Sequence, residues 1–130
     1  YVKTIGIEAR TLEEMLTKDL LPAISEYAAE VSANAATKKE FLPSLSTASE
    51  EALVTKLSDA YTTLTDGVAE LKVLAEKAGA MEDAQAAADA SHSEVLAKMD
   101  ELRTTASEIE ALIPDSILPY PTYDQLLFSL

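Results

Sequence analysis

The sequence predicts an all-α fold, an elongated antiparallel bundle of three long helices, on the strength of two observations. Hydrophobic residues make up 48% of the 130 residues, yet only five Tyr and two Phe are aromatic, so Ala and Leu dominate the apolar content. Ala and Leu lose little side-chain freedom in a helix, whereas aromatic and β-branched residues favour strands. Apolar residues also recur every three or four positions over three long stretches, which is the period of one helix face.

The first helix is expected over residues 11–39. Thr11 and Glu14 have the spacing of a capping box, in which both side chains bond to backbone N–H groups of the first turn. An apolar stripe follows, formed by Leu12, Leu16, Leu20, Ile24, Tyr27 and Val31. Pro22 lies within the stripe and crowds the carbonyl of Lys18, so we expect a kink near Lys18 and not a break.

The second helix is expected over residues 47–78, after a loop at residues 40–46 that contains Pro43. A second capping box, Thr47 with Glu50, marks its start. Its stripe is formed by Leu53, Leu57, Ala60, Leu64, Gly67, Leu71, Leu74 and Ala78. Asp66 and Gly67 are a strong turn signal, but the stripe continues through them in phase and predicts one unbroken helix. Gly79 is the type of residue expected just past a helix end.

The third helix is expected over residues 81–113, where Pro114 stops it. Its stripe is formed by Ala88, His92, Val95, Met99, Leu102, Ala106, Ile109 and Ile113. The short connections make consecutive helices antiparallel. Residues 114–130 form a Pro-rich tail, and Asp124 is expected to cap a short helical turn at residues 124–128.

Charge and composition exclude several classes of function. The net charge of -13 repels phosphate backbones and anionic bilayers, so neither nucleic acid nor a membrane is an expected partner. No run approaches the roughly 20 apolar residues that a membrane-spanning helix needs. The absence of cysteine removes disulfides and thiolate chemistry, and the cytoplasm is the expected location.

No catalytic, cofactor-binding or metal-binding residue is predicted in this chain. Asp89 and His92 have the acid-x-x-His spacing of half a di-iron site, but such a site needs a second His and further carboxylates. We expect His92 to lie at the apolar stripe and to share a hydrogen bond with Asp89 or the backbone. The three glycines are too scattered to form a phosphate-binding loop. A carboxylate metal enzyme remains the weakest of the alternatives.

The two ends of the chain are apolar without belonging to a stripe. Residues 1–7 are interpreted as an extended lead-in, which divides the chain into residues 1–10, a helical part at 11–113 and the tail at 114–130. Because residue 1 is Tyr, the start has the character of a cut within a longer polypeptide, whereas the other end has that of a natural terminus. Each end either folds onto its own helices or docks on a larger body. The candidate interface residues are Ile5, Ile7, Tyr120, Tyr123, Leu127 and Phe128.

These same ends resemble the C-terminal region of type III glutamine synthetases. The run YVKTIGIEARTLEEMLTKDLLPA at residues 1–23 is similar to the segment that follows the catalytic domain in that family, and PYPTYDQLLF at residues 119–128 is similar to its terminal signature. The intervening helices resemble the family in pattern and length. Gly6 stands where the family usually has Asn, and Leu118 where it usually has Trp.

The resemblance implies a parent enzyme that uses ATP to join ammonia to glutamate, with divalent metals held in a catalytic domain that lies outside this chain. It also implies a homo-oligomer of double-ring form. ATP and metal residues are therefore expected elsewhere, and this chain is expected to be a structural or assembly extension that packs on its own catalytic domain or between neighbouring subunits. The alternative is an independent acidic helical module that binds another protein.

Overall fold

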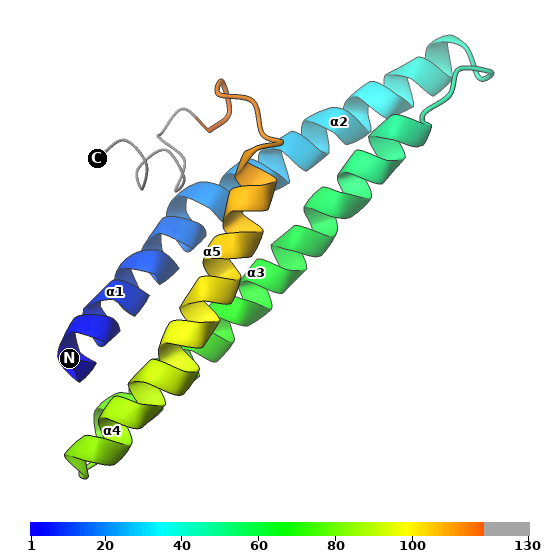
Figure 1. Cartoon of the computed structure of the whole chain (residues 1–130). Helices are drawn as coiled ribbons and strands as arrows, with labels where there is room; N and C mark the ends of the chain where they lie inside the picture. Colours follow the sequence, from blue (N-terminus) through cyan, green and yellow to red (C-terminus); the bar gives the residue numbers. More distant parts are fainter. Residues whose placement is uncertain (119–130) are drawn as a thin grey trace.

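The structure is a computed structural model that describes residues 1–118 of the chain. All regular secondary structure in these residues is helical, which confirms the predicted all-α class. Figure 1 shows two long helical segments and a shorter third one. Their elements are α1 (Val2–Met15), the π-helical turn η1 (Leu16–Leu20), α2 (Leu21–Phe41), α3 (Ala48–Ala80), α4 (Ala84–Ala90), the π-helical turn η2 (Ser91–Val95) and α5 (Leu96–Glu110).

The first segment begins nine residues earlier than the predicted start at residue 11, because α1 starts at Val2. The prediction of an extended lead-in at residues 1–7 is therefore wrong. Ile5 and Ala9 are buried and continue the stripe of Leu12 toward the N-terminus at helical spacing. Thr11 lies inside the helix, where its hydroxyl donates to the carbonyl oxygen of Ile7 over 3.0 Å and does not cap anything.

A π-helical turn lies where Pro22 was expected to disturb the first helix. The backbone N–H of Leu21 bonds to the carbonyl of Leu16, five residues back, and the helix continues without a break. Pro22 has no N–H to bond the carbonyl of Lys18, so a wider turn accommodates the missing bond. Leu12, Leu16, Leu20 and Ile24 are all buried across this turn, as the predicted stripe required.

The second segment, α3, runs unbroken from Ala48 to Ala80, which confirms that the turn signal at Asp66 and Gly67 is overridden by packing. Five residues of its predicted stripe are buried and the other three are partly buried against the same core. Gly79, expected beyond the helix end, instead lies inside α3. No residue among those described has a positive φ, so Gly79 does not form the left-handed cap that was predicted.

The start of α3 is where the sequence placed it, but the predicted capping box does not form. The hydroxyl of Thr47 donates to Glu51 Oε2 over 3.1 Å. Glu50 instead accepts from Lys38 Nζ at 2.7 Å, across the connection between α2 and α3. This hydrogen bond lowers the pKa of Glu50. The Glu50 carboxylate thus links α2 to α3 and does not cap the N-terminus of α3.

The third segment covers residues 84–110 and not the predicted 81–113. Its start is fixed by Asp83, whose Oδ2 accepts from the backbone N–H of Ala86 over 3.0 Å. Its end comes at Glu110, before Pro114. The predicted start at residue 81 is wrong because the backbone of Met81 is extended.

Replacing Asp83 with Ala is expected to lower the free energy of unfolding by about 0.5–2 kcal/mol, because the first turn of α4 loses its side-chain acceptor. Urea denaturation of the chain, followed by circular dichroism at 222 nm, measures this difference. Glu82→Ala, which removes a neighbouring exposed carboxylate that makes no cap, serves as the control. Equal effects of the two substitutions would contradict the capping role.

The apolar stripe of the third segment is correct from Val95 onward and is displaced by one residue before it. Ala87 and Ser91 are buried, whereas the predicted Ala88 is only partly buried and His92 is exposed. The change of register falls at η2, where the backbone N–H of Leu96 bonds to the carbonyl of Ser91. A π turn holds one residue more than an α turn. The residues before η2 are therefore shifted by one position on the buried face, relative to a regular α-helix.

All three segments contribute to one hydrophobic core. α2 packs along α3, and both α1 and α5 also pack against α3 (Figure 1). Leu57, Leu64 and Leu71 of α3 are fully buried at the centre of this arrangement. After α5, the turn that follows Pro114 returns Leu118 to the same core. Of the predicted tail at residues 114–130, the part at 119–130, with the helical turn at 124–128, lies outside the described residues.

The α2–α3 hairpin extends beyond the end of α5 (Figure 1). Phe41 at its tip is 83% exposed. Across residues 1–118, none of the helices combines the length and the apolar character that crossing a bilayer requires.

Candidate functional site

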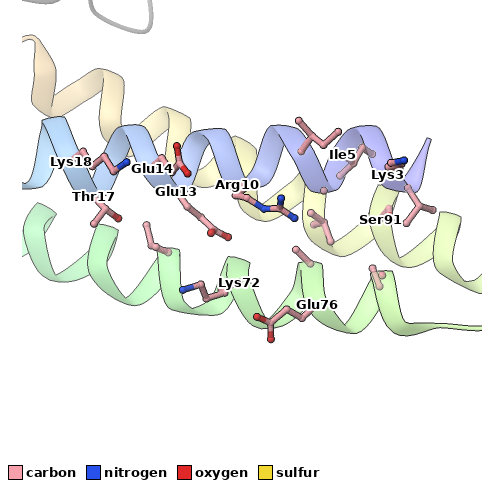
Figure 2. Close-up of a pocket in the computed structure, with 18 residues that line it drawn as sticks. Lys3, Ile5, Arg10, Glu13, Glu14, Thr17, Lys18, Lys72, Glu76 and Ser91 are labelled. Carbon is pink, nitrogen blue, oxygen red and sulfur yellow. The ribbon is translucent and has the colours of Figure 1, made fainter.

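A groove of about 1020 Å³ runs along the surface between α1 and α3 (Figure 2). We call it the α1–α3 groove. One wall is α1, where Arg10 and Glu13 point toward α3, and Lys72 and Glu76 stand on the α3 side. The buried residues Ser91 and Val95 of η2 form part of its floor. The groove therefore exists because the first and second segments, far apart in sequence, rest side by side on the third.

The α1–α3 groove concentrates positive charge on a strongly acidic chain. Among its described lining residues are four of the ten basic residues and only three of the 23 acidic ones. The basic residues are Lys3, Arg10, Lys18 and Lys72. The salt bridges within residues 1–118 all lie elsewhere, on Lys38, Lys98 and Arg103. Within this part of the chain, the four basic groups of the groove thus have no carboxylate within ion-pairing distance.

Partial burial in the groove raises the pKa of Glu13 above its ordinary value. Lys72 and Arg10 oppose this rise in the pKa by attraction, while Glu76 and Glu14 add to it by repulsion. The folded state therefore disfavours the Glu13 carboxylate relative to the unfolded chain. The resulting loss of stability is absent at low pH and develops as the pH rises through the unfolded and then the folded pKa.

Glu13→Gln is therefore expected to raise the midpoint of urea unfolding at pH 7 and to leave it unchanged near pH 3, where Glu13 is protonated in both states. Glu14→Gln, which removes the same charge from an exposed neighbour, is the control and should have a smaller effect at pH 7. A destabilising effect of Glu13→Gln at pH 7 would show that the carboxylate is favourably paired in the folded chain.

Two glycines line the same groove, Gly6 on α1 and Gly79 on α3. Both are helical, and a Cβ atom added at either position would meet nothing within 4 Å. Glycine within a helix is destabilising by about 1 kcal/mol relative to Ala. Nothing in the packing of residues 1–118 thus requires a glycine at either position.

The predicted interface residues Ile5 and Ile7 differ in burial. Ile5 is only 5% exposed and packs in the chain's own core. Ile7, two positions further on, is 54% exposed and lines the α1–α3 groove. Tyr120, Tyr123, Leu127 and Phe128 lie outside the described residues. The signal missed in the sequence was the helical spacing of Ile5, Ala9 and Leu12, which places Ile5 inside and Ile7 outside.

The hydrogen-bond partner of His92 is neither Asp89 nor the backbone, the two that were expected, but Tyr1. His92 Nδ1 lies 3.2 Å from the hydroxyl oxygen of Tyr1, whereas Asp89 Oδ1 accepts from Gln85 Nε2 over 2.9 Å. The register shift at η2 turns His92 outward, where it links η2 to the first residue of the chain. In the part of the chain that the structure describes, no group of three or more potential metal ligands lies together.

Two comparisons with known proteins bear on this chain. The family model described as the glutamine synthetase C-terminal domain matches residues 1–39. Over all 130 residues the chain is 38% identical to a glutamine synthetase from Butyrivibrio fibrisolvens. The resemblance to glutamine synthetases is confirmed. The chain spans about a fifth, 19%, of that glutamine synthetase. No solved structure matches the chain.

The match to the glutamine synthetase C-terminal domain falls on one part of the fold. Residues 1–39 contain α1, η1 and nearly all of α2. They include the α1 wall of the groove, with Arg10, Glu13 and the exposed Ile7. The match also includes Pro22 and the π turn beside it. The predicted boundary at residue 10 falls inside α1, and the family match also spans this position.

Proposed function

We propose that this chain acts as the C-terminal structural and assembly domain of a glutamine synthetase, as one elongated antiparallel helical bundle. The observation that carries the proposal is the 38% identity to a glutamine synthetase over the entire chain, combined with coverage of only 19% of that relative. A segment of this size accounts for a minor part of such an enzyme. The reaction itself, ATP-dependent ligation of ammonia to glutamate, belongs in this proposal to the remaining four-fifths, with its ATP and divalent metals.

The proposed role is to pack on the catalytic domain or between neighbouring subunits of a homo-oligomer in the cytoplasm. Two features of the surface support it. Ile7 is largely exposed beside the groove, whereas Ile5, Ala9 and Leu12 of the same helix are buried. The groove also holds basic side chains without ion pairs in the described residues, which a larger body can satisfy.

Deleting residues 1–130 of this chain from the full-length enzyme tests the proposed role. We expect a smaller assembly by analytical ultracentrifugation and a lower melting temperature, because surfaces that the domain covers become exposed. Adding the separate chain back should restore part of both. A truncated enzyme with unchanged mass, melting temperature and ligase activity would contradict a role in assembly.

The tail is tested separately by Tyr120→Ala combined with Phe128→Ala in the full-length enzyme. Loss of two aromatic contacts at an interface is expected to weaken assembly by roughly 1–4 kcal/mol or more. Tyr61→Ala provides the control, since Tyr61 is 40% exposed on α3 and is not part of the tail. Unchanged assembly of the double variant would remove the tail, though not the whole domain, from the interface.

A further inference from the structure

We infer that the α1–α3 groove is the docking site for a carboxylate-bearing helix of the same glutamine synthetase polypeptide, from the part that lies outside this chain. The inference rests on the proposed function and deepens it by naming the surface and its occupant. It follows from the shape of the groove, its charge, its glycines and the position of the chain's first residues.

The shape of the groove suits a helix. Two roughly parallel helical walls and a floor from a third element are the setting in which a further helix packs as an additional member of a bundle. Ile7 and Val68 supply apolar surface along the walls, and Val95 lies in the floor. Gly6 and Gly79 lie on opposite walls without any atom above them within 4 Å. Their lack of a Cβ allows the backbone of a docked helix to approach closely.

The charge of the groove selects the chemistry of the occupant. Lys3, Arg10, Lys18 and Lys72 have no ion pair within residues 1–118. The groove also holds Glu13, Glu14 and Glu76, so four basic against three acidic residues leave its lining with a net charge of +1, on a chain whose net charge is -13. Complementarity therefore favours carboxylates on the docked helix, placed opposite the four basic side chains. Two other occupants fit less well. A second copy of this acidic chain is repelled by its own net charge, and residues 119–130 carry a single acidic side chain, Asp124.

The geometry of the chain also favours the longer polypeptide. Val2 and Lys3 line one end of the groove, so α1 begins at its mouth. The match to a C-terminal domain and the 19% coverage of a relative leave most of such an enzyme on the N-terminal side of α1. A segment that precedes α1 in the polypeptide therefore starts from this end of the groove.

Carbodiimide cross-linking of the full-length enzyme tests the inference, because this reagent joins a lysine amine only to a carboxylate that touches it. The pairs Lys38 with Glu50 and Lys98 with Glu70, each at 2.7 Å, are built-in positive controls. Mass spectrometry is expected to find Lys18 and Lys72 joined to carboxylates that precede Tyr1 in the polypeptide. If the control pairs are cross-linked and the groove lysines are not, the inference is overturned. It is also overturned if the groove lysines are joined only to Asp124, or only to an isotopically labelled second copy of this chain.

Reversing the charge of basic residues in the groove is a second, independent test of the inference. Lys3→Glu with Lys18→Glu in the full-length enzyme is expected to speed hydrogen exchange of the α1 amides by about tenfold or more, because attraction to the docked helix becomes repulsion. Lys56→Glu with Lys77→Glu makes the same change of charge on exposed sites of α3 outside the groove, and should leave this exchange unchanged. Equal effects of the two double variants would contradict docking in the groove.

The two proposals fail in different ways. If deletion of the whole chain disrupts the assembly while the groove lysines form no cross-links and charge reversal has no specific effect, the groove inference is wrong and the assembly role stands. If deletion leaves assembly and activity unchanged, the proposed function itself is wrong.

Discussion

Replacing Leu64 with Ala is expected to lower the free energy of unfolding by about 2–5 kcal/mol. Leu64 is fully buried on α3, the helix that α1, α2 and α5 all contact, so truncation leaves a cavity at the centre of the core. The surrounding helices cannot collapse into this cavity without separating elsewhere. Urea denaturation of the chain, with stability taken from the linear extrapolation, measures the difference.

Leu42→Ala is the matched control for Leu64. Leu42 is 45% exposed in the connection after α2, so the same truncation there should change the stability by about 0.5 kcal/mol or less. A small effect at Leu64, or similar effects at both positions, would mean that α3 is not the centre of the core.

Replacing Gly67 with Leu should destabilise the chain by about 1–3 kcal/mol or more, through overpacking. Gly67 is buried on α3, and an added Cβ would overlap the Cδ2 atom of Leu102. Leu102 is itself only 3% exposed, so its side chain has little free space into which to move. The glycine therefore permits the close approach of α3 and α5, despite its poor helix propensity.

Gly79→Leu is the control for this substitution, because Gly79 lies on the same helix and faces open space within residues 1–118. Here the better helix propensity of Leu should stabilise the chain by about 0.5–1 kcal/mol. Opposite signs of the two effects in thermal or urea unfolding are the expected result. Stabilisation at both glycines would show that α3 and α5 do not depend on close contact at Gly67.

The apolar spacing was sufficient to predict α3 but not the register of the third segment. In α3 the alternation of three and four residues is regular from Leu53 to Ala78, and every predicted stripe residue is buried or partly buried. In the third segment the first four buried residues are Ala87, Ser91, Val95 and Met99, each four apart. A step of four residues rotates the side chain about 40° beyond one α-helical turn. After three such steps the side chain would no longer lie on the buried face of the helix, unless a wider turn intervenes.

The same spacing marks the other π turn. Leu12, Leu16, Leu20 and Ile24 are buried at successive intervals of four, with η1 in their middle. A run of such intervals was visible in the sequence before Pro22 and could have predicted the wider turn. The corresponding run in the third segment is hidden in the sequence, because Ser91 is polar and His92 fits the alternating pattern of three and four residues better.

The groove could not be predicted from the sequence for a different reason. Its walls come from residues about 50 positions or more apart, and spacing along one helix says nothing about the gap between two. The error at residues 1–7 added to this, because an extended lead-in has no face that could form a wall. Ile7 was nevertheless singled out, since an apolar residue near the chain's start needs a surface to cover it.

Determining the structure of the full-length enzyme by electron cryomicroscopy tests the central claim most directly. We predict that residues 1–118 pack against the catalytic body or a neighbouring subunit, with a helix bearing carboxylates in the groove between α1 and α3. Helices that project freely into solvent, with Ile7, Arg10 and Lys72 uncovered, would contradict the account.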